Sequence, residues 1–163
     1  MSIFNFSDIT IRPAVEQDLG AVEQLLEANQ LPLAGVADSL HDFIVAESGG
    51  RLVGVVGLEV CCEHALLRST AVVPEWRDRG LGRKLVEQII AEAEARGLQA
   101  LYLLTTTAER YFPSFGFVRT SRALVPGPVR ETEEFRAACP ASATVMCLTL
   151  ERDAASACET SSR

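Results

Sequence analysis

Residues 68–83 read RSTAVVPEWRDRGLGR and join an apolar strand to a helix through a proline-containing turn and two glycines. Gly80 and Gly82 stand where the helix begins, and residues without side chains let a ligand reach the backbone amides. The first turn of a helix has unpaired N–H groups and the positive end of the helix dipole, which suit a phosphate. Three basic side chains add charge-assisted donors: Arg77, Arg79 and Arg83. The stretch therefore predicts a pyrophosphate site at the start of a helix.

Two common phosphate-binding patterns do not account for this stretch. No Gly-Lys-Ser/Thr follows the glycines, so it is not a P-loop, and the glycine spacing differs from that of a dinucleotide fingerprint. The remaining alternative is a glycine-started helix with a solvated basic face. The complete succession of strand, proline, turn and helix favours the phosphate site over that alternative.

The whole chain has the composition of an ordinary globular protein. It has 163 residues, of which 48% are hydrophobic and 23% charged, and no apolar run approaches the length of a membrane span. We expect one domain over residues 1–151 and a flexible C-terminal tail over 152–163, which is small, polar and free of aromatic residues. The first residues lack the features of a secretory signal, so the expected location is cytoplasmic.

The charge distribution argues for a local anionic ligand. Lys and Arg number 15 against 22 Asp and Glu, so the formal net charge is −7, which disfavours nucleic acid and anionic membranes as partners. Residues 77–84 nevertheless carry four cations and one anion. The five cysteines show no C-x-x-C spacing, and we expect them to be small buried residues in a reducing compartment, with no metal bound.

The hydrophobic pattern predicts a mixed α/β (α+β) fold, with a single sheet flanked by helices. Hairpin-like successions of strands alternate with helical crossovers, which argues against a doubly wound parallel sheet. The expected strands are 9–12, 43–47, 52–58, 64–73, 98–104, 117–122 and 143–151. The expected helices are 15–29, 80–96, a short one from residue 108, and 131–138, with a loop over 126–128 and Gly97 ending the second helix.

With this stretch and two further segments, the sequence resembles the GNAT family of acyl-CoA-dependent N-acyltransferases. Its pyrophosphate-binding signature is similar to the series Val72, Pro74, Arg77, Gly80 and Gly82. Residues 11–14 with 18–19 resemble the first strand and helix of that family, and residues 108–117 resemble a later segment that ends in Gly-Phe. The resemblance covers roughly residues 9–151.

The resemblance implies a splayed mixed sheet, with acetyl-CoA as the co-substrate between the strands at 66–73 and 98–105. Backbone groups near Ala71 and Val72 would pair with the pantetheine arm. The amides of residues 79–82 and the Arg77 side of the turn would hold the pyrophosphate. The implied cofactor-binding residues are Ala71, Val72, Arg77, Arg79, Gly80, Leu81, Gly82 and Arg83.

A narrower resemblance concerns the GNAT subgroup associated with arsenic resistance. It rests on residues 66–69, 103–109, 133–135 and 139–143, which read LLRS, LLTTTAE, EEF and CPASA. The proposed acceptors of that subgroup are amino-acid-like compounds such as arsinothricin, an arsenic-containing glutamate analogue.

The expected catalytic residues are Glu59 and Tyr111. In direct transfer a general base takes a proton from the acceptor ammonium. Glu59 follows a strongly apolar strand, where a carboxylate is unusual unless it has a function. Its alternative is a strand-end residue that faces solvent. In the family a tyrosine four residues before the glycine of Gly-Phe protonates the leaving thiolate, but here that position is Phe112 and Tyr111 precedes it. Tyr111 is therefore either that acid or a packing residue.

The expected substrate-binding residues are Arg68, Thr70 and Thr105. Arg68 shares strand parity with apolar neighbours and with Thr70, and a cation in such a strand needs an anion. It either clamps a substrate carboxylate or forms an internal salt bridge, for example with Glu59. Thr105 would line the same cleft, and the irregular segments 30–40 and 124–140 would select the acceptor.

The leading functional prediction is an acetyl-CoA-dependent N-acetyltransferase for the amine of a small amino-acid-like molecule. Acetylation of a protein N-terminus or lysine is an alternative, although the acidic chain and Arg68 favour a small acid. A non-catalytic acyl-CoA-binding regulator is the other alternative, and the displaced tyrosine keeps it open. A homodimer is compatible with all three.

Overall fold

The computed structural model describes residues 8–106, 108–132, 135–136 and 142–150. The strands are β1 (Ile9–Pro13), β2 (Phe43–Ser48), β3 (Arg51–Cys61), β4 (His64–Val72), β5 (Ala100–Thr105), β6 (Val118–Thr120) and β7 (Thr144–Thr149). The α-helices are α1 (Leu19–Ala28), α2 (Val36–Ser39), α3 (Leu81–Ala95) and α4 (Gly127–Arg130). Short 3-10 helices are η2 (Glu16–Asp18), η3 (Leu40–Asp42), η4 (Pro74–Trp76), η5 (Phe112–Phe115) and η6 (Arg122–Leu124).

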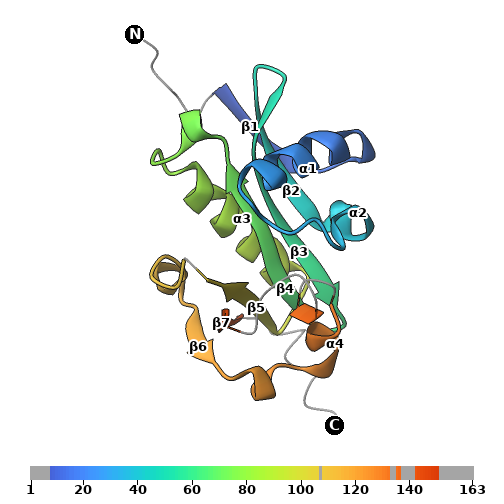
Figure 1. Ribbon diagram of the computed structural model, residues 1–163, viewed down its shortest axis with the longest axis vertical. Helices are drawn as coiled ribbons and strands as arrows, with labels where there is room; N and C mark the ends of the chain where they lie inside the picture. Colours follow the sequence, from blue (N-terminus) through green and yellow to red (C-terminus); the bar gives the residue numbers. More distant parts are fainter. Residues whose placement is uncertain (1–7, 107, 133–134, 137–141, 151–163) are drawn as a thin grey trace. The chain divides into compact units, whose positions relative to one another are not determined.

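The strands form a 7-stranded mixed sheet in the order β1-β2-β3-β4-β5-β7-β6 (Figure 1). The pairs β1–β2, β2–β3, β5–β7 and β6–β7 are antiparallel, while β4–β5 is parallel. The β4–β5 ladder runs from the pair His64–Ala100 to the pair Leu66–Tyr102, although β4 itself continues to Val72. This confirms the expected fold class of a splayed mixed sheet. None of the helices in the described residues is long and apolar enough to cross a bilayer.

The chain divides into two compact units. Unit 1 comprises residues 1–58 and 69–89, and unit 2 comprises residues 59–68 and 90–163. Strand β4 and helix α3 each contribute residues to both units. The prediction of one domain over 1–151 stays a prediction, and the predicted tail at 152–163 lies outside the described residues.

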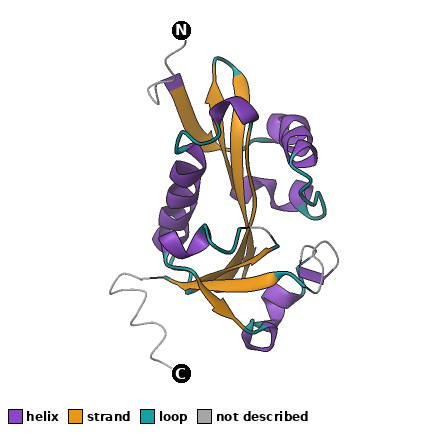
Figure 2. Cartoon of the chain, turned by 60° about the vertical axis from the view of Figure 1, so that its left-hand side comes forward, coloured by secondary structure: helices purple, strands orange, loops and turns teal. Residues whose placement is uncertain are grey.

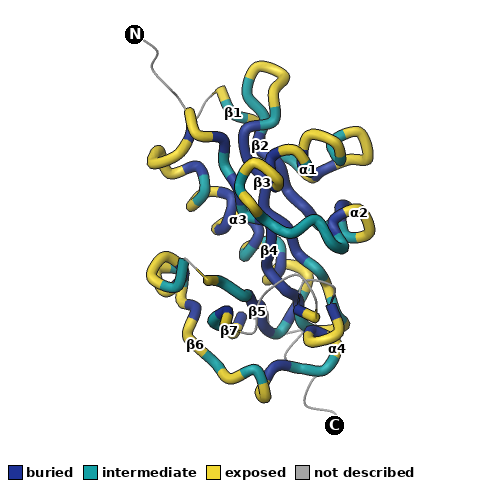
Figure 3. The backbone as a smooth tube through the Cα atoms, in the orientation of Figure 1, coloured by how far each residue is buried: buried dark blue, intermediate teal, exposed yellow. Residues whose placement is uncertain are grey.

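Unit 1 is built on β1, β2 and β3. The first half of α3 lies on one face of these strands, and α1 with α2 lies on the other (Figure 2). Strands β2 and β3 are buried along most of their length because both faces are covered (Figure 3).

Two glycines of β3 let neighbouring side chains approach its backbone. Gly57 pairs with Phe43 of β2, and a Cβ at position 57 would overlap the Phe43 ring. A Cβ at Gly54 would lie 2.8 Å from Leu85 Cδ1 of α3. The missing side chain at Gly54 therefore lets the first half of α3 pack closely against the sheet.

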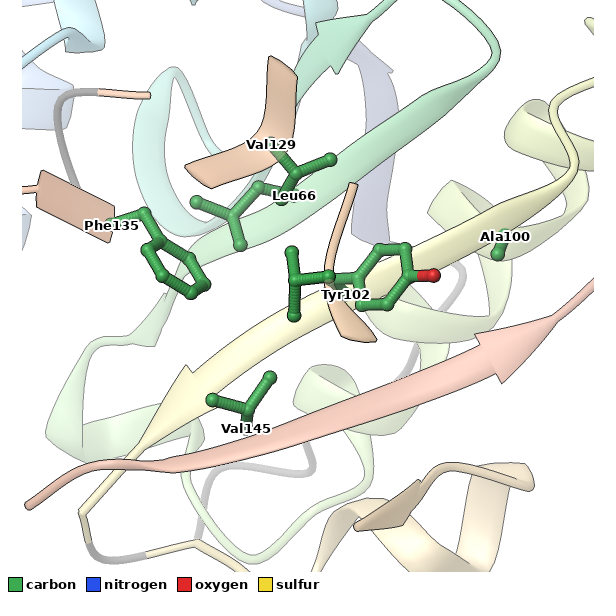
Figure 4. Packing of buried hydrophobic residues seen from close by; sticks show 7 residues of the cluster. Leu66, Ala100, Tyr102, Val129, Phe135 and Val145 are labelled. Carbon is green, nitrogen blue, oxygen red and sulfur yellow. The ribbon is translucent and has the colours of Figure 1, made fainter. Parts of the chain in front are cut away.

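Unit 2 has its own hydrophobic cluster on one face of β4, β5 and β7. The cross-strand row Leu66, Tyr102 and Cys147 starts it, because directly paired residues point to the same face of a sheet. Figure 4 shows Val129 of α4 and Phe135 packed over Leu66, Tyr102 and Val145. Helix α4 and Phe135 thus cover this face.

Several short elements differ from the sequence-based expectations. The expected helix from residue 108 is a turn that leads into η5 at Phe112–Phe115, and the strand at 117–122 is shorter, at Val118–Thr120. The expected loop at 126–128 begins α4, because proline is well suited to the first turn of a helix. The helix expected at 15–29 begins as η2 and becomes α-helical at Leu19. Half of the expected helix at 131–138 lies outside the described residues.

Candidate functional site

The predicted phosphate site is a turn in unit 1 that links β4 to α3. Val73 N–H donates to Val53 O at 2.9 Å, which attaches the end of β4 to β3. Pro74 then starts η4, in which Trp76 N–H donates to Val73 O at 3.0 Å, and the Trp76 side chain is buried. The buried Trp76 indole anchors the turn to the protein interior, while the other residues of the turn, 74–75 and 77–80, are exposed.

Two left-handed residues bring the chain from this turn into the helix. Asp78 has φ 61° and Gly80 has φ 86°. Gly80 O accepts from Lys84 N–H at 3.1 Å, so Gly80 caps α3 and the amides of the next three residues belong to its first turn. Leu81 and Leu85 are fully buried, which fixes the direction of the helix. The predicted arrangement of Gly80, Leu81 and Gly82 at a helix start is therefore present.

The arginines of the turn hold its backbone. Arg77 Nε donates to Val72 O at 3.0 Å, and Arg77 Nη2 donates to Asn29 Oδ1 at 2.8 Å. Arg79 Nε donates to Glu75 O at 2.9 Å. Arg83 lies 3.6 Å from Glu87 one helical turn later, as an exposed ion pair. Two of the side chains that were expected to bind phosphate, those of Arg77 and Arg79, thus hold the backbone of the turn, and their contacts with phosphate stay a prediction.

Asn29 is a residue of this site that sequence reasoning missed. It follows the last residue of α1, and its Nδ2 donates to Leu25 O at 2.9 Å. Asparagine is common directly after a helix, so the sequence alone gives no sign of a role for Asn29. Its hydrogen bond with Arg77 reveals that role. The other predicted donor-site residues, Ala71 and Val72, close β4, with Ala71 buried and Val72 O already accepting from Arg77.

Glu59 and Arg68 face each other within unit 2. Arg68 Nη1 lies 2.8 Å from Glu59 Oε1, and the side chains are 0% and 13% exposed. Burying a guanidinium requires a charged partner, and Glu59 is that partner. The structure thus contains the internal salt bridge that was the alternative for Arg68. Roles of Arg68 in substrate binding and of Glu59 as a base stay predictions.

The strand parity that linked Arg68 to Thr70 is interrupted. Ser69 has φ 62° and is buried within β4. A left-handed residue breaks the alternation of side chains between the two faces, as in a β-bulge. Parity therefore does not place Thr70, which is half-buried in unit 1, on the same face as Arg68.

Tyr111 stands at the surface of unit 2 and Phe112 in its interior. Tyr111 is 38% exposed, and its ring lies 5.2 Å from the Phe112 ring and 5.3 Å from the Phe115 ring. Phe112 is buried against Phe117, with ring centroids 5.7 Å apart. The residue at the family's tyrosine position is thus a packing residue, whereas Tyr111 is partly exposed.

Thr105 has a local structural task. Its Oγ1 accepts from Ala108 N–H at 2.8 Å, so it caps the turn that follows β5. A role of Thr105 in substrate binding stays a prediction.

The cysteines of the described residues are free thiols: Cys61 and Cys147, which are half-buried, and Cys62, which is exposed. The expectation that they are buried is therefore wrong for Cys62, which lies in the β3–β4 turn. Burial raises the pKa of the Cys61 thiol to about 11 and also raises that of Cys147. Both thiols are therefore protonated at neutral pH and are poor nucleophiles. Among the described residues no group of His, Cys, Asp and Glu side chains could hold a metal ion.

Two aromatic side chains beside these thiols are also held neutral. Burial raises the pKa of Tyr102 to about 12 and lowers the pKa of His64. Their rings lie 6.0 Å apart at a tilted angle. His64 is half-buried against Tyr102.

The comparisons with known proteins agree with this fold and turn. Residues 39–119 match the family model of the acetyltransferase (GNAT) domain. An uncharacterized N-acetyltransferase of Chlorobaculum tepidum is 25% identical over 134 residues, which cover 74% of this chain and 82% of that protein. An amino-acid acetyltransferase of Pseudomonas fluorescens is 33% identical over 89 residues, covering 53% of this chain and 21% of that protein.

A solved structure shows the same fold. N-acetylglutamate synthase from Neisseria gonorrhoeae, complexed with coenzyme A and N-acetyl-glutamate, superposes with a TM-score of 0.76 at 23% identity. The match covers 93% of this chain and 36% of that one. The chain therefore spans roughly a fifth to a third of the amino-acid acetyltransferases that it resembles.

The chain contains an acetyltransferase domain of the GNAT type. Enzymes of this class transfer the acetyl group of acetyl-CoA, their co-substrate, to an amine.

Proposed function

We propose that this chain acetylates the amine of a small amino-acid-like molecule, with acetyl-CoA as the donor. The observation that carries the proposal is the turn between β4 and α3, in which Gly80 caps the helix and leaves its first amides for an anion. The name of the Pseudomonas fluorescens relative supports an amino acid as acceptor.

The donor side of the reaction is a positioning task. The amides of residues 79–82 bind the pyrophosphate, with Arg83 adding positive charge, and the backbone of Ala71 and Val72 holds the pantetheine arm. Holding the thioester at a fixed place converts the attack of the amine into an effectively unimolecular step.

On the acceptor side, Glu59 is the proposed general base. The acceptor ammonium must lose a proton before its nitrogen can attack the thioester carbon, and a carboxylate can take it through a water molecule. Arg68 either binds the acceptor carboxylate or fixes the orientation of Glu59, and its planar guanidinium can contact two oxygens at once. Tyr111 is the proposed acid that protonates the leaving thiolate, with Thr70 and Thr105 contacting the acceptor.

The acceptor class includes arsenic-containing amino acids such as arsinothricin. Support comes from the stretches 66–69 and 103–109 of the sequence, while residues 133–134 and 139–141 lie outside the described part. The free thiols at Cys61, Cys62 and Cys147 accord with a reducing compartment, and we place the reaction in the cytoplasm.

The test is thiol release from acetyl-CoA across amino acids, their carboxamides, arsinothricin and N-terminal peptides. We expect turnover with a free amino acid and strong discrimination against its amide. Gly82→Val should weaken acetyl-CoA binding about tenfold or more, because a side chain obstructs charge-assisted bonds to the phosphate. Gly20→Val is the matched control, since a Cβ at Gly20 meets nothing within 4 Å.

Each other outcome rejects part of the proposal. Turnover with peptides alone would make the chain a protein acetyltransferase, and acetyl-CoA binding without turnover on any amine would make it a regulator. If Arg68→Ala discriminates between acid and amide as the wild type does, Arg68 serves only as the partner of Glu59.

A further inference from the structure

A chain of hydrogen bonds joins the end of α1 to the glycine turn within unit 1. Asn29 Nδ2 donates to Leu25 O at 2.9 Å, Arg77 Nη2 donates to Asn29 Oδ1 at 2.8 Å, and Arg77 Nε donates to Val72 O at 3.0 Å. The central bond joins Asn29 and Arg77, which lie 48 residues apart in the sequence. No requirement of the helix or the strand alone explains the central bond.

The amide of Asn29 can serve both neighbours in one orientation only. Its nitrogen is the donor that the carbonyl of Leu25 needs, and its oxygen is the acceptor that the guanidinium needs. The backbone fixes its place, since Asn29 N–H donates to Leu25 O and Leu26 O at 3.2 and 3.1 Å. The helix end therefore aims the Asn29 oxygen at Arg77.

Arg77 is in turn held by three hydrogen bonds, two to the backbone of the β4–α3 connection and one to Asn29. Besides its two side-chain bonds, its N–H donates to Pro74 O at 3.2 Å. A guanidinium is planar, so two simultaneous bonds fix both its position and its orientation. Arg77 precedes the cap residue Gly80 by three residues, so holding Arg77 holds the approach to the first-turn amides.

We propose that Asn29 is a positioning residue for acetyl-CoA: it orients Arg77, which sets the backbone that presents the pyrophosphate amides. The inference rests on the donor site of the proposed function. It predicts an effect on acetyl-CoA binding from a residue whose contacts are a helix carbonyl and an arginine, and no effect on the chemical step once the donor is bound.

The test is calorimetric acetyl-CoA affinity in a double-mutant cycle of Asn29→Ala and Arg77→Ala. Asn29→Ala should weaken binding by about three- to tenfold, which corresponds to the net contribution of one ordinary hydrogen bond. Because Asn29 acts through Arg77, the double variant should bind no worse than Arg77→Ala alone. The KM for acetyl-CoA should rise by the same factor while kcat at saturation stays at the wild-type value.

Asn29→Asp separates positioning from helix stability. An aspartate keeps the acceptor for Arg77 but loses the donor to Leu25, and a negative charge at a helix C-terminus is unfavourable. This variant should therefore melt at a lower temperature than the wild type and yet bind acetyl-CoA within about twofold of it. Gln30→Gly, which leaves both Asn29 contacts in place, is the matched control and should bind as the wild type does.

The outcomes are distinguishable. Additive losses in the cycle, or an Asn29→Asp variant that binds as weakly as Asn29→Ala, would show that Asn29 only ends the helix. An unchanged affinity in Asn29→Ala would also reject the inference while leaving the donor site intact. A wild-type chain that does not bind acetyl-CoA at all would instead reject the proposed function.

Discussion

At the scale of single residues, Asp18 collects three donors at the start of the first helix. Its two carboxylate oxygens accept from Arg12 Nη1 at 2.8 Å and Nη2 at 3.0 Å, and Oδ2 also accepts from Val15 N–H at 2.8 Å. Arg12 Nε donates further to Glu47 at 3.1 Å. The hydrogen bonds from Arg12 hold the pKa of Asp18 below its usual range, against the opposing effect of burial.

Asp18 should therefore make the free energy of unfolding depend on pH. A carboxylate with a lowered pKa stabilises the fold at pH values above its unfolded pKa, and this contribution is lost as pH falls through the folded value. Asp18→Asn should lower the free energy of unfolding by about 1–3 kcal/mol at pH 7, and the difference should shrink below about pH 4. Urea unfolding at pH 7 and pH 3 measures this.

Glu16→Gln is the control for that experiment, because Glu16 is an exposed acid in the same short helix. A difference between Asp18→Asn and the wild type that is equal at both pH values would contradict the assignment.

The residue scale also shows where sequence reasoning succeeds. Arg68 was identifiable because a cation among apolar strand residues needs an anion, and Glu59 could be named as its partner. Asn29 could not be found, because its partner Arg77 is distant in sequence and reaches it only after the turn has formed. The role of Tyr111 could not be decided either, since a one-residue shift exchanges the exposed and buried positions with Phe112.

At the scale of elements, two helices end in the same way with different residues. After α1, Gln30 N–H donates to Glu27 O at 3.0 Å and Leu31 N–H to Leu26 O at 2.9 Å. After α3, the equivalent bonds run from Gly97 to Glu94 and from Leu98 to Ala93, at 3.0 and 3.2 Å. Both are Schellman motifs, in which the residue after the cap is left-handed, with φ 59° at Gln30 and 75° at Gly97.

The two ends should respond oppositely to substitution. Gln30→Gly should raise the free energy of unfolding by about 1 kcal/mol, since glycine adopts the left-handed conformation without the steric cost of a Cβ. Gly97→Ala should lower it by about the same amount. For a chain of this size each change corresponds to roughly 2–4 °C in melting temperature, which calorimetry resolves. A loss of stability in Gln30→Gly would show that its side chain contributes more than its conformation costs.

Elements with strong local signals were predictable from sequence, and weak ones were not. The periodic apolar residues of α3 and Gly97 after its end predicted helix boundaries within one residue of Leu81–Ala95. The α4 helix covers four residues and forms where the chain packs Val129 into the unit 2 cluster. Such a short helix depends on tertiary contacts, which the pattern of residues 126–128 does not contain.

At the scale of the whole molecule, the sheet combines local and distant pairings. The strands β2, β3 and β4 follow sequence order and were predicted from apolar runs separated by turns, whereas helices separate β1 from its partner β2. The order β5-β7-β6 does not follow the sequence, because β7 lies between β5 and β6. The pairs Ala100–Thr149 and Thr105–Thr144 join residues that only the folded chain brings together. Family resemblance, not periodicity, supplied the expectation of a splayed sheet.

Ser69 of β4 has a consequence for the sequence variation that this chain tolerates. The boundary between the two units in this strand falls between Arg68 and Ser69, where the backbone adopts φ 62° in a buried position. Residues branched at Cβ are disfavoured in that conformation although they are favoured in ordinary strands. A saturation library selected for folded protein should therefore enrich Gly, Asn and Asp at position 69 and deplete Val and Ile. The neighbouring positions Leu67 and Ala71 should show the reverse preference, and enrichment of valine at all three would mean that the strand is continuous.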